Sequence, residues 1–354
     1  LYISPLKALN NDIYVNLKKP LAELEEIYFQ KKRNFRKLNI SVRSGDSSAK
    51  ERRDMIKNPP DILITTPESL NVLLTSEQGR SSLANFGTVI LDEIHAIADS
   101  KRGVWLMSAI ERLANLYGEF QRIAISATIN PVQLIEKFIG GYQLIRKSDY
   151  CEYRQRKVTT IKSQISKNYK LQLNFPFKKI EEKQTDWWQL LSINYKDLIN
   201  KSSSSLFFSN SRRTVEKLSR LLNLLGLDDV YSHHGSLSRE IRVEVEKKFR
   251  NGELSAIIAT NSLELGIDIG SVDQVILIQP PQSISSAIQR IGRSGHGVGQ
   301  TSVGIFSPTN SHDLLESFVL AKYISAEHVE KIKLQESPLD VLIRSGFPES
   351  LSVL

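Results

Sequence analysis

Short apolar segments of strand type alternate with longer helical patterns along most of the chain, and this alternation restricts the possible folds more than any other feature. The helical patterns include the stretch 105–117. Such alternation is typical of α/β proteins, in which helices cover the faces of a parallel sheet. We therefore expect mainly parallel, doubly wound sheets. The strand-type segments are 62–65, 88–91, 122–126, 206–209, 256–260 and 275–278.

The length of the chain favours two lobes. Its 354 residues exceed one ordinary core and suit two α/β lobes of about 150 residues each. We expect the first lobe at 1–149, a connection at 150–185, the second lobe at 186–309 and a helical tail at 310–354. The chain opens on a leucine, and its first residues already have the pattern of a strand that finishes in a turn. The sequence thus predicts a chain that begins inside a domain.

Composition narrows the class of protein. A formal net charge of +8 permits a polyanionic partner without identifying one, because a modest basic excess is common in proteins that bind nothing charged. The single cysteine cannot form an internal disulfide, which fits a reducing compartment. The sequence has no run of about 18 apolar residues and no signal peptide. We expect a soluble, cytoplasmic protein with no membrane partner.

Two adjacent acids follow the apolar strand-type segment at 88–91. These acids, Asp92 and Glu93, are expected at the carboxyl edge of a sheet, where α/β proteins bind phosphate and magnesium. A bland alternative is a pair of solvated acids at a helix start, where the helix dipole favours negative charge. In the functional interpretation, Asp92 holds Mg²⁺ through water and Glu93 orients and deprotonates the attacking water.

Two arginines, Arg290 and Arg293, stand three residues apart in the second half of the chain, beside Gly292. They match surface charges that form ion pairs worth under about 1 kcal/mol. They also match arginine fingers, because residues three apart on a helix face the same way and both guanidinium groups then reach phosphate. Gln289 is a candidate for placing the attacking water.

Two further segments carry weaker signals. The hydroxyls of Ser126 and Thr128 follow a strand and are candidates for relaying nucleotide state, although small hydroxyl triplets are common. Asp268, close to Gly266, is a candidate partner for a ribose hydroxyl, although a turn there needs no function. The adjacent histidines at 233–234 have no cysteine or carboxylate at ligand spacing, so no metal site is predicted there.

The two halves of the chain echo each other. In each half a glycine turn, which includes Gly45 or Gly235, precedes a charged helix and then an apolar strand that ends in threonine. Matched hydroxyls and amides at two sheet edges would hold successive phosphates of one nucleic-acid strand. Coincidence is the alternative, because the match is loose.

Taken in order, these segments resemble the motifs of superfamily-2 helicases, most closely the Lhr-type (large helicase-related) DEAD/DEAH-box enzymes. The resemblance covers nearly the whole chain. The matching segments are Ser4-Pro5-Leu6-Lys7-Ala8-Leu9, Arg43-Ser44-Gly45-Asp46, Thr65-Thr66-Pro67-Glu68-Ser69-Leu70, Asp92-Glu93-Ile94-His95, Ser126-Ala127-Thr128, Phe208-Ser209-Asn210-Ser211-Arg212-Arg213, His233-His234-Gly235-Ser236-Leu237-Ser238, 259–270 and 289–296.

The resemblance implies two RecA-like lobes and a nucleic-acid-dependent ATPase. Such an enzyme moves along a single strand of DNA or RNA, expected to be DNA and 3′ to 5′, and hydrolyses ATP with Mg²⁺ between its lobes. We expect it to be a monomer. The residues it assigns to ATP are Asp92, Glu93, Gly266, Asp268, Gln289, Arg290 and Arg293, with His95, Ser126 and Thr128 for coupling. The residues it assigns to nucleic acid are Ser4, Pro5, Lys7, Gly45, Asp46, Thr66, Pro67, Asn210, Gly235, Thr260 and Asn261.

One departure from the family pattern affects the functional expectation. Family members carry a phosphate loop upstream and a winged-helix domain downstream, but no Gly-x-x-x-x-Gly-Lys-[Ser/Thr] occurs in this sequence. We therefore expect a fragment that is inactive alone and whose parent protein hydrolyses ATP. Two alternatives stay open: a clamp that binds nucleic acid without turnover, and an RNA-remodelling DEAD-box protein.

Overall fold

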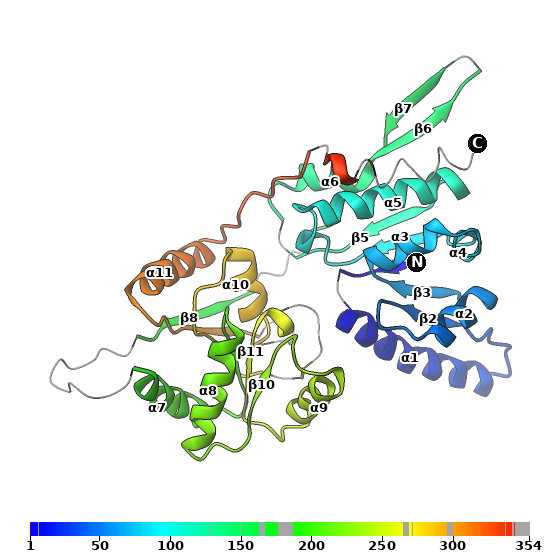
Figure 1. Cartoon of the computed structure of the whole chain (residues 1–354). Helices are drawn as coiled ribbons and strands as arrows, with labels where there is room; N and C mark the ends of the chain where they lie inside the picture. The colour runs from blue at the N-terminus through cyan, green and yellow to red at the C-terminus, as the bar shows by residue number, and fades with distance from the viewer. Residues whose placement is uncertain are drawn as a thin grey trace. The chain divides into compact units, whose positions relative to one another are not determined.

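The protein is described here by a computed structural model, in which two compact units are formed, Leu1–Ile161 with Lys331–Leu354, and Lys162–Glu330 (Figure 1). No described helix is long and apolar enough to cross a membrane. Each unit has its own sheet and core. The structure describes residues 1–5, 7–127, 129–148, 150–162, 167–175, 187–264, 269–270, 272–295, 300–336, 338–341 and 343.

The first unit contains a five-stranded sheet whose strand pairs are all parallel, as the alternation predicts. In spatial order its strands are β2 (Ile40–Arg43), β3 (Ile62–Thr65), β1 (Tyr2–Ile3), β4 (Thr88–Leu91) and β5 (Gln121–Ala124). Its helices are α1 (Lys7–Gln30), α2 (Ala49–Lys57), α3 (Pro67–Thr75), α4 (Glu77–Ser81), α5 (Lys101–Tyr117) and α6 (Val132–Gly140), with a short 3₁₀ turn η1 (Ile94–Ala96).

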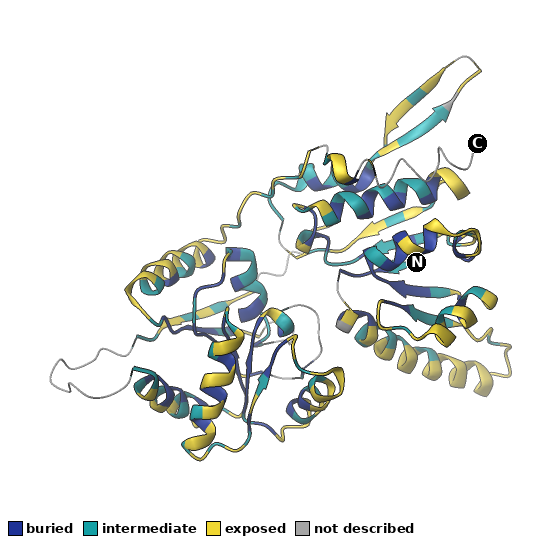
Figure 2. Cartoon of the chain, viewed as in Figure 1, coloured by how far each residue is buried: buried dark blue, intermediate teal, exposed yellow. Residues whose placement is uncertain are grey.

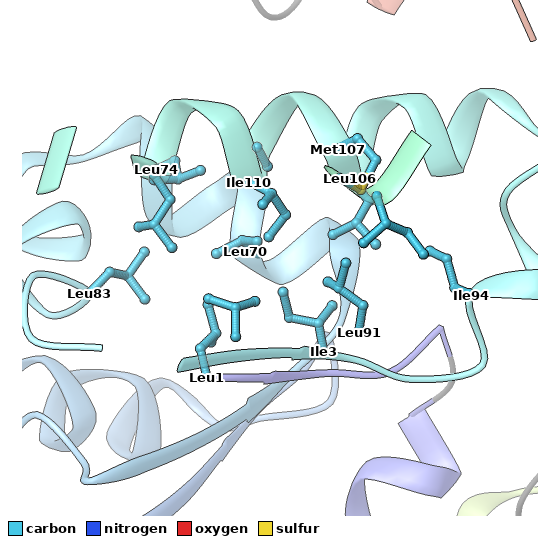
Figure 3. Close-up of a cluster of buried hydrophobic side chains, with 14 of the residues drawn as sticks. Leu1, Ile3, Leu70, Leu74, Leu83, Leu91, Ile94, Leu106, Met107 and Ile110 are labelled. Carbon is cyan, nitrogen blue, oxygen red and sulfur yellow. The ribbon is translucent and has the colours of Figure 1, made fainter. Parts of the chain in front are cut away.

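The core of the first unit lies between the sheet and helices α3 and α5 (Figure 3). Ile3 and Leu91 from neighbouring strands meet Leu70 of α3 and Leu106 of α5, and all four are at most 1% exposed. Helix α3 starts sharply because Pro67 occupies its first turn and the Thr66 side chain caps it. The core therefore fixes the ends of β1, β3 and β4 relative to one another.

The stretch predicted as the connection, 150–185, contains strands of both units. Strands β6 (Tyr142–Arg146) and β7 (Cys151–Gln155) form an antiparallel hairpin that projects from the first unit (Figure 1). Strand β8 (Tyr169–Leu173) joins the second sheet by pairing with β13. An edge strand needs no continuous apolar run, which is why this polar segment gave no strand signal. Residues 163–166 and 176–186 of this stretch lie outside the described residues.

The second unit contains a six-stranded parallel sheet. Its spatial order is β10 (Val230–His233), β11 (Ala256–Ala259), β9 (Ser205–Phe208), β12 (Gln274–Leu277), β13 (Ser302–Phe306) and β8. Its central strands are buried on both faces (Figure 2). The helices are α7 (Trp187–Ile199), α8 (Arg212–Leu224), α9 (Arg239–Arg250), α10 (Ile284–Ile291) and α11 (Ser311–Ser325), with the 3₁₀ turn η2 (Asn261–Leu263). Helix α11 lies where the helical tail was predicted, but residues from Lys331 onward group with the first unit.

The echo between the two halves is present in the topology. The order β2-β3-β1-β4-β5 in the first sheet corresponds strand by strand to β10-β11-β9-β12-β13 in the second. Even the bonds just beyond the strands repeat: the Ser4 amide donates to the Thr65 carbonyl at 3.0 Å, and the Ser209 amide donates to the Ala259 carbonyl at 2.9 Å. Equivalent residues at the two carboxyl edges can therefore be compared directly.

The packing of α10 on β13 yields a stability prediction. A Cβ added at Gly304 would lie 2.8 Å from Cγ1 and 2.9 Å from Cδ1 of Ile291, which is fully buried in α10. Gly304→Ala should therefore lower the free energy of unfolding of the second unit by about 1–3 kcal/mol through overpacking. Gly235→Ala is the matched control, because a Cβ there meets nothing within 4 Å. Urea unfolding measures both, and equal stability of the two variants would contradict the packing described.

Candidate functional site

The carboxyl edge of the first sheet collects polar residues from several strands. Ser4 follows β1, Thr66 follows β3, Asp92 follows β4 and Ser126 lies two residues beyond β5. Because all of these strands are parallel, their carboxyl ends meet at one edge, which is where α/β proteins bind ligands. The structure thus brings together, on one edge, residues that the sequence assigned to ATP, to coupling and to nucleic acid.

Both carboxylate oxygens of Asp92 accept hydrogen bonds. Oδ1 accepts from the backbone amide of Glu93 at 2.9 Å, and Oδ2 accepts from the hydroxyl of Tyr2 at 2.6 Å. The Asp92 amide itself donates to the carbonyl of Ile3 at 2.9 Å, which ties the residue to β1. Two adjacent carboxylates supply the oxygen ligands that Mg²⁺ prefers, so the residues present fit that ion.

Glu93 adopts a left-handed backbone conformation with φ 48°. For a residue with a Cβ this conformation costs about 1–2 kcal/mol, and it persists where the surroundings enforce it. Here the bond from the Glu93 amide to Asp92 and the start of η1 hold the backbone in place. In this conformation Glu93 Oε2 lies 3.4 Å from Nδ1 of His95.

The side chain of His95 connects the acids to the end of β5. Its Nδ1 lies 3.0 Å from the Ser126 hydroxyl and 3.3 Å from the Ala127 amide, which donates to it. An amide N–H can only donate, so Nδ1 is an acceptor and the imidazole is neutral. Burial lowers the pKa of His95 and outweighs the opposing charge of Asp92, in agreement with a neutral ring. His95 and Ser126, two residues assigned to coupling, therefore lie within hydrogen-bonding distance of each other. Thr128 lies outside the described residues.

The lowered pKa of His95 makes the first unit sensitive to acid. Below pH about 6.5 the unfolded chain protonates this imidazole and the folded protein resists, so the stabilising contribution is present above that pH and is lost as pH falls. The free energy of unfolding should therefore fall less between pH 7.5 and 5.5 in His95→Asn than in the unchanged protein. Denaturant unfolding at a series of pH values measures this, and identical pH slopes would contradict the neutral assignment.

Several predicted nucleic-acid residues have side chains already engaged within the first unit. The Thr66 hydroxyl accepts from the Ser69 amide at 3.3 Å to cap α3, and Thr66 is only 3% exposed. Lys7 Nζ lies 2.6 Å from Asp46 Oδ1, with both side chains about half exposed, and a Cβ added at Gly45 would lie 3.0 Å from the same ammonium. Of this group, the lysine is thus the residue with an accessible positive charge.

Arg102 connects two of the predicted nucleic-acid segments and was not foreseen from sequence. Its Nε donates to Glu68 Oε1 at 2.5 Å, and one terminal nitrogen donates to Glu68 Oε2 at 3.1 Å and to the Pro5 carbonyl at 2.6 Å. Burial acts to raise the pKa of Glu68, but the bonds and charge of Arg102 outweigh it and hold that pKa below its usual value. Nothing in the local pattern marks Arg102, because its partners lie 34 and 97 residues away.

In the second unit Arg290 is buried, with 5% of its surface exposed. Its Nε donates to Glu264 Oε2 at 2.9 Å, a terminal nitrogen donates to Asn210 Oδ1 at 3.2 Å, and the guanidinium lies 5.3 Å from the ring centre of Phe208. These contacts connect α10 with the end of β9 and with the residue after η2. The described contacts of Arg290 are thus those of a residue that orders the second unit.

Asn210 lies at the centre of the same network. Its Nδ2 donates to the Pro280 carbonyl at 2.8 Å, and its amide donates to Gln279 Oε1 at 3.3 Å. Gln279 Oε1 also accepts from the Ser209 hydroxyl at 3.0 Å. The carboxyl ends of β9 and β12 are therefore joined through side chains, as those of β1 and β4 are in the first unit.

The adjacent histidines pair with carboxylates from distant helices. His233 Nε2 lies 3.0 Å from Glu246 and its Nδ1 lies 2.8 Å from the Ser262 hydroxyl, while His234 Nε2 lies 2.5 Å from Glu216. The ring nitrogens are thus used to order the loop that contains Gly235. Thr260 and Asn261 begin the next loop, beside Ser262.

The remaining assigned residues divide into described and undescribed ones. Gln289 lies in α10 and Arg293 two residues after it, both partly exposed. Gly266, Asp268 and His296 lie outside the described residues.

The Arg290–Glu264 pair yields a second stability prediction. Both side chains are nearly buried, so Arg290→Met leaves an uncompensated carboxylate and should cost about 3–5 kcal/mol of unfolding free energy. Adding Glu264→Leu should recover part of this loss, because no charge is then left buried. Arg213→Met on the exposed face of α8 is the control and should change stability by less than about 0.5 kcal/mol. A double variant less stable than Arg290→Met alone would contradict the pairing.

Comparison with known proteins gives consistent matches. Residues 1–135 match the family model for DEAD/DEAH box helicases, and residues 182–297 match the helicase conserved C-terminal domain. The ATP-dependent helicase Lhr-Core protein 2 of Thermococcus barophilus is 38% identical over 97% of this chain and 40% of its own length. The ATP-dependent helicase Lhr-Core of Methanothermobacter thermautotrophicus is 40% identical over 97% of this chain and 39% of its own length.

A solved structure agrees with these matches. The structure of Mycobacterium smegmatis helicase Lhr bound to ssDNA and AMP-PNP has a TM-score of 0.87 and 37% identity, over 96% of this chain and 44% of that one. The chain thus spans about 40% of the length of the curated relatives described above.

Proposed function

The chain belongs to the Lhr-type helicases of the DEAD/DEAH box superfamily, and from this premise we propose that it forms the motor core of an ATP-dependent helicase acting on single-stranded nucleic acid. One observation carries the proposal. Neighbouring strands β1 and β4 end side by side, one in Ser4 and Pro5 and the other in Asp92 and Glu93. The turn proposed to bind single-stranded nucleic acid and the two proposed catalytic acids thus follow neighbouring strands of one sheet.

The chemistry assigned to the first unit is activation of water. Glu93 is the base that accepts the proton of the attacking water, and its left-handed backbone directs the carboxylate away from the strand. Asp92, held at both oxygens, is the acid that would hold Mg²⁺ through water. When bound, this ion supplies positive charge that stabilises the transferring phosphoryl group.

In the second unit, Arg293 is proposed to supply positive charge to ATP and Gln289 to place water. Arg290 is better suited to ordering α10, because its charge is already paired with Glu264. Gly266 and Asp268 remain candidates for the nucleoside part of ATP. This division assigns proton transfer to one unit and charge stabilisation to the other.

Single-stranded DNA is the proposed track, moved along 3′ to 5′. The relative from Mycobacterium smegmatis, named as bound to ssDNA and AMP-PNP, supports this choice at 37% identity. Lys7 would contact phosphate by exchanging its bond to Asp46. Against a clamp without turnover, the chain retains both acids, each held in a defined conformation.

Glu93→Gln tests the assignment of the base. Hydrolysis is measured on the product of the whole gene, because the 354 residues contain no Gly-x-x-x-x-Gly-Lys-[Ser/Thr]. The amide cannot accept a proton, so turnover should fall by at least about 100-fold, while the Kd values for ATP and for single-stranded DNA stay unchanged. Glu77→Gln, on the exposed first turn of α4, is the matched control.

Three results would count against the proposed function. Unchanged turnover in Glu93→Gln would remove Glu93 as the base. A parent protein that binds single strands but does not hydrolyse ATP would support the clamp instead. Turnover stimulated by RNA and not by DNA would indicate an RNA-remodelling enzyme.

A further inference from the structure

Tyr2 places a hydroxyl on the acid that the proposed function assigns to Mg²⁺. In the parallel register of β1 and β4, Tyr2 pairs with Ile90 and Ile3 pairs with Leu91. Side chains alternate along a strand, so Ile3 enters the core while Tyr2 lies on the face shared by Ile90 and Asp92. From this face the Tyr2 hydroxyl donates to Asp92 Oδ2 at 2.6 Å.

We propose that Tyr2 is a positioning residue that fixes the Asp92 carboxylate in the orientation needed to hold Mg²⁺; this rests on the proposed function. A carboxylate on a single free bond can rotate, and rotation moves both oxygens away from the ion. The Glu93 amide holds Oδ1 and the Tyr2 hydroxyl holds Oδ2, so rotation would break two hydrogen bonds. Each oxygen keeps further lone pairs for metal-bound water.

The Tyr2 phenol is the donor in its bond with Asp92 Oδ2, because a carboxylate oxygen can only accept. A phenylalanine at this position would fill the same space without the donor.

Tyr2 also lies close in the sequence to residues that are proposed to bind DNA. Only Ile3 separates Tyr2 from Ser4 and Pro5, which are proposed to contact the strand. If β1 shifts when single-stranded DNA binds, the Tyr2 hydroxyl that bonds to Asp92 would shift with it. Asp92 is thus held by two contacts. One comes from Tyr2, next to the segment proposed to bind DNA, and the other comes from the Glu93 amide.

The test is Tyr2→Phe in the product of the whole gene. Partners that orient metal ligands typically contribute about 10- to 100-fold to metal affinity. We expect the Mg²⁺ concentration for half-maximal ATP turnover to rise by about 10-fold or more, with turnover restored at high Mg²⁺. Binding of Mn²⁺ in the presence of AMP-PNP, followed by electron paramagnetic resonance, should weaken by the same factor. The Kd for single-stranded DNA in the absence of nucleotide should stay unchanged.

Tyr195→Phe is the matched control. It removes a fully buried phenol hydroxyl that accepts from Ser307 at 3.0 Å in the second unit. It should lower the unfolding midpoint without moving the Mg²⁺ dependence. A Mg²⁺ dependence of Tyr2→Phe equal to that of the unchanged protein, or a loss that high Mg²⁺ does not restore, would overturn the positioning role. Absence of Mg²⁺-dependent turnover in the unchanged protein would instead overturn the proposed function.

Discussion

The parallel pairing of β1 with β4 is the interaction on which the rest of the first unit depends. The Ile90 amide donates to the Leu1 carbonyl at 2.8 Å and the Asp92 amide donates to the Ile3 carbonyl at 2.9 Å, so the two strands end at the same level. Above them the chain makes two turns, one through Ser4 and the other through Glu93. A shift of one residue in this register would turn Tyr2 away from Asp92 and bring Ile3 out of the core.

The second unit repeats this arrangement with different chemistry. Phe208 of β9 pairs with Leu277 of β12, as Ile3 pairs with Leu91. The residues that correspond to Asp92 and Glu93 are therefore Ile278 and Gln279. Ile278 is buried and apolar, and Gln279 bonds to Ser209 and Asn210. The same topology therefore has acids at this position in the first unit. In the second unit it has a neutral hydrogen-bond network whose Asn210 accepts from Arg290 of α10.

Much of the fold followed from the sequence, because buried parallel strands are continuous apolar runs. The strands β3, β4, β9, β11 and β12 were visible in this way, and the acids after β4 followed from their place at a strand end. Strand β8 was missed because an edge strand with exposed positions has no such run. The matching strand orders of the two sheets agree with the repeated turn, helix and strand of the two halves, although the repeat by itself does not specify a strand order.

The contacts of the site were less accessible to sequence reasoning. Arg290 and Arg293 look equivalent in the sequence, and only the fold shows that Arg290 meets Glu264 and Asn210 inside the second unit. Arg102 and Tyr2 gave no signal, because their partners are far away in the chain. Long-range hydrogen bonds of this kind depend on strand order and register, which local patterns do not specify.

The most direct test of the account is the rate of ATP hydrolysis by the product of the whole gene, measured with and without saturating single-stranded DNA. The turn after β1, which is proposed to bind the nucleic acid, is joined to the acids after β4 through the pairing of these two strands. Binding of single-stranded DNA should therefore raise the turnover rate. Equal rates with and without a strand that is shown to bind would contradict it.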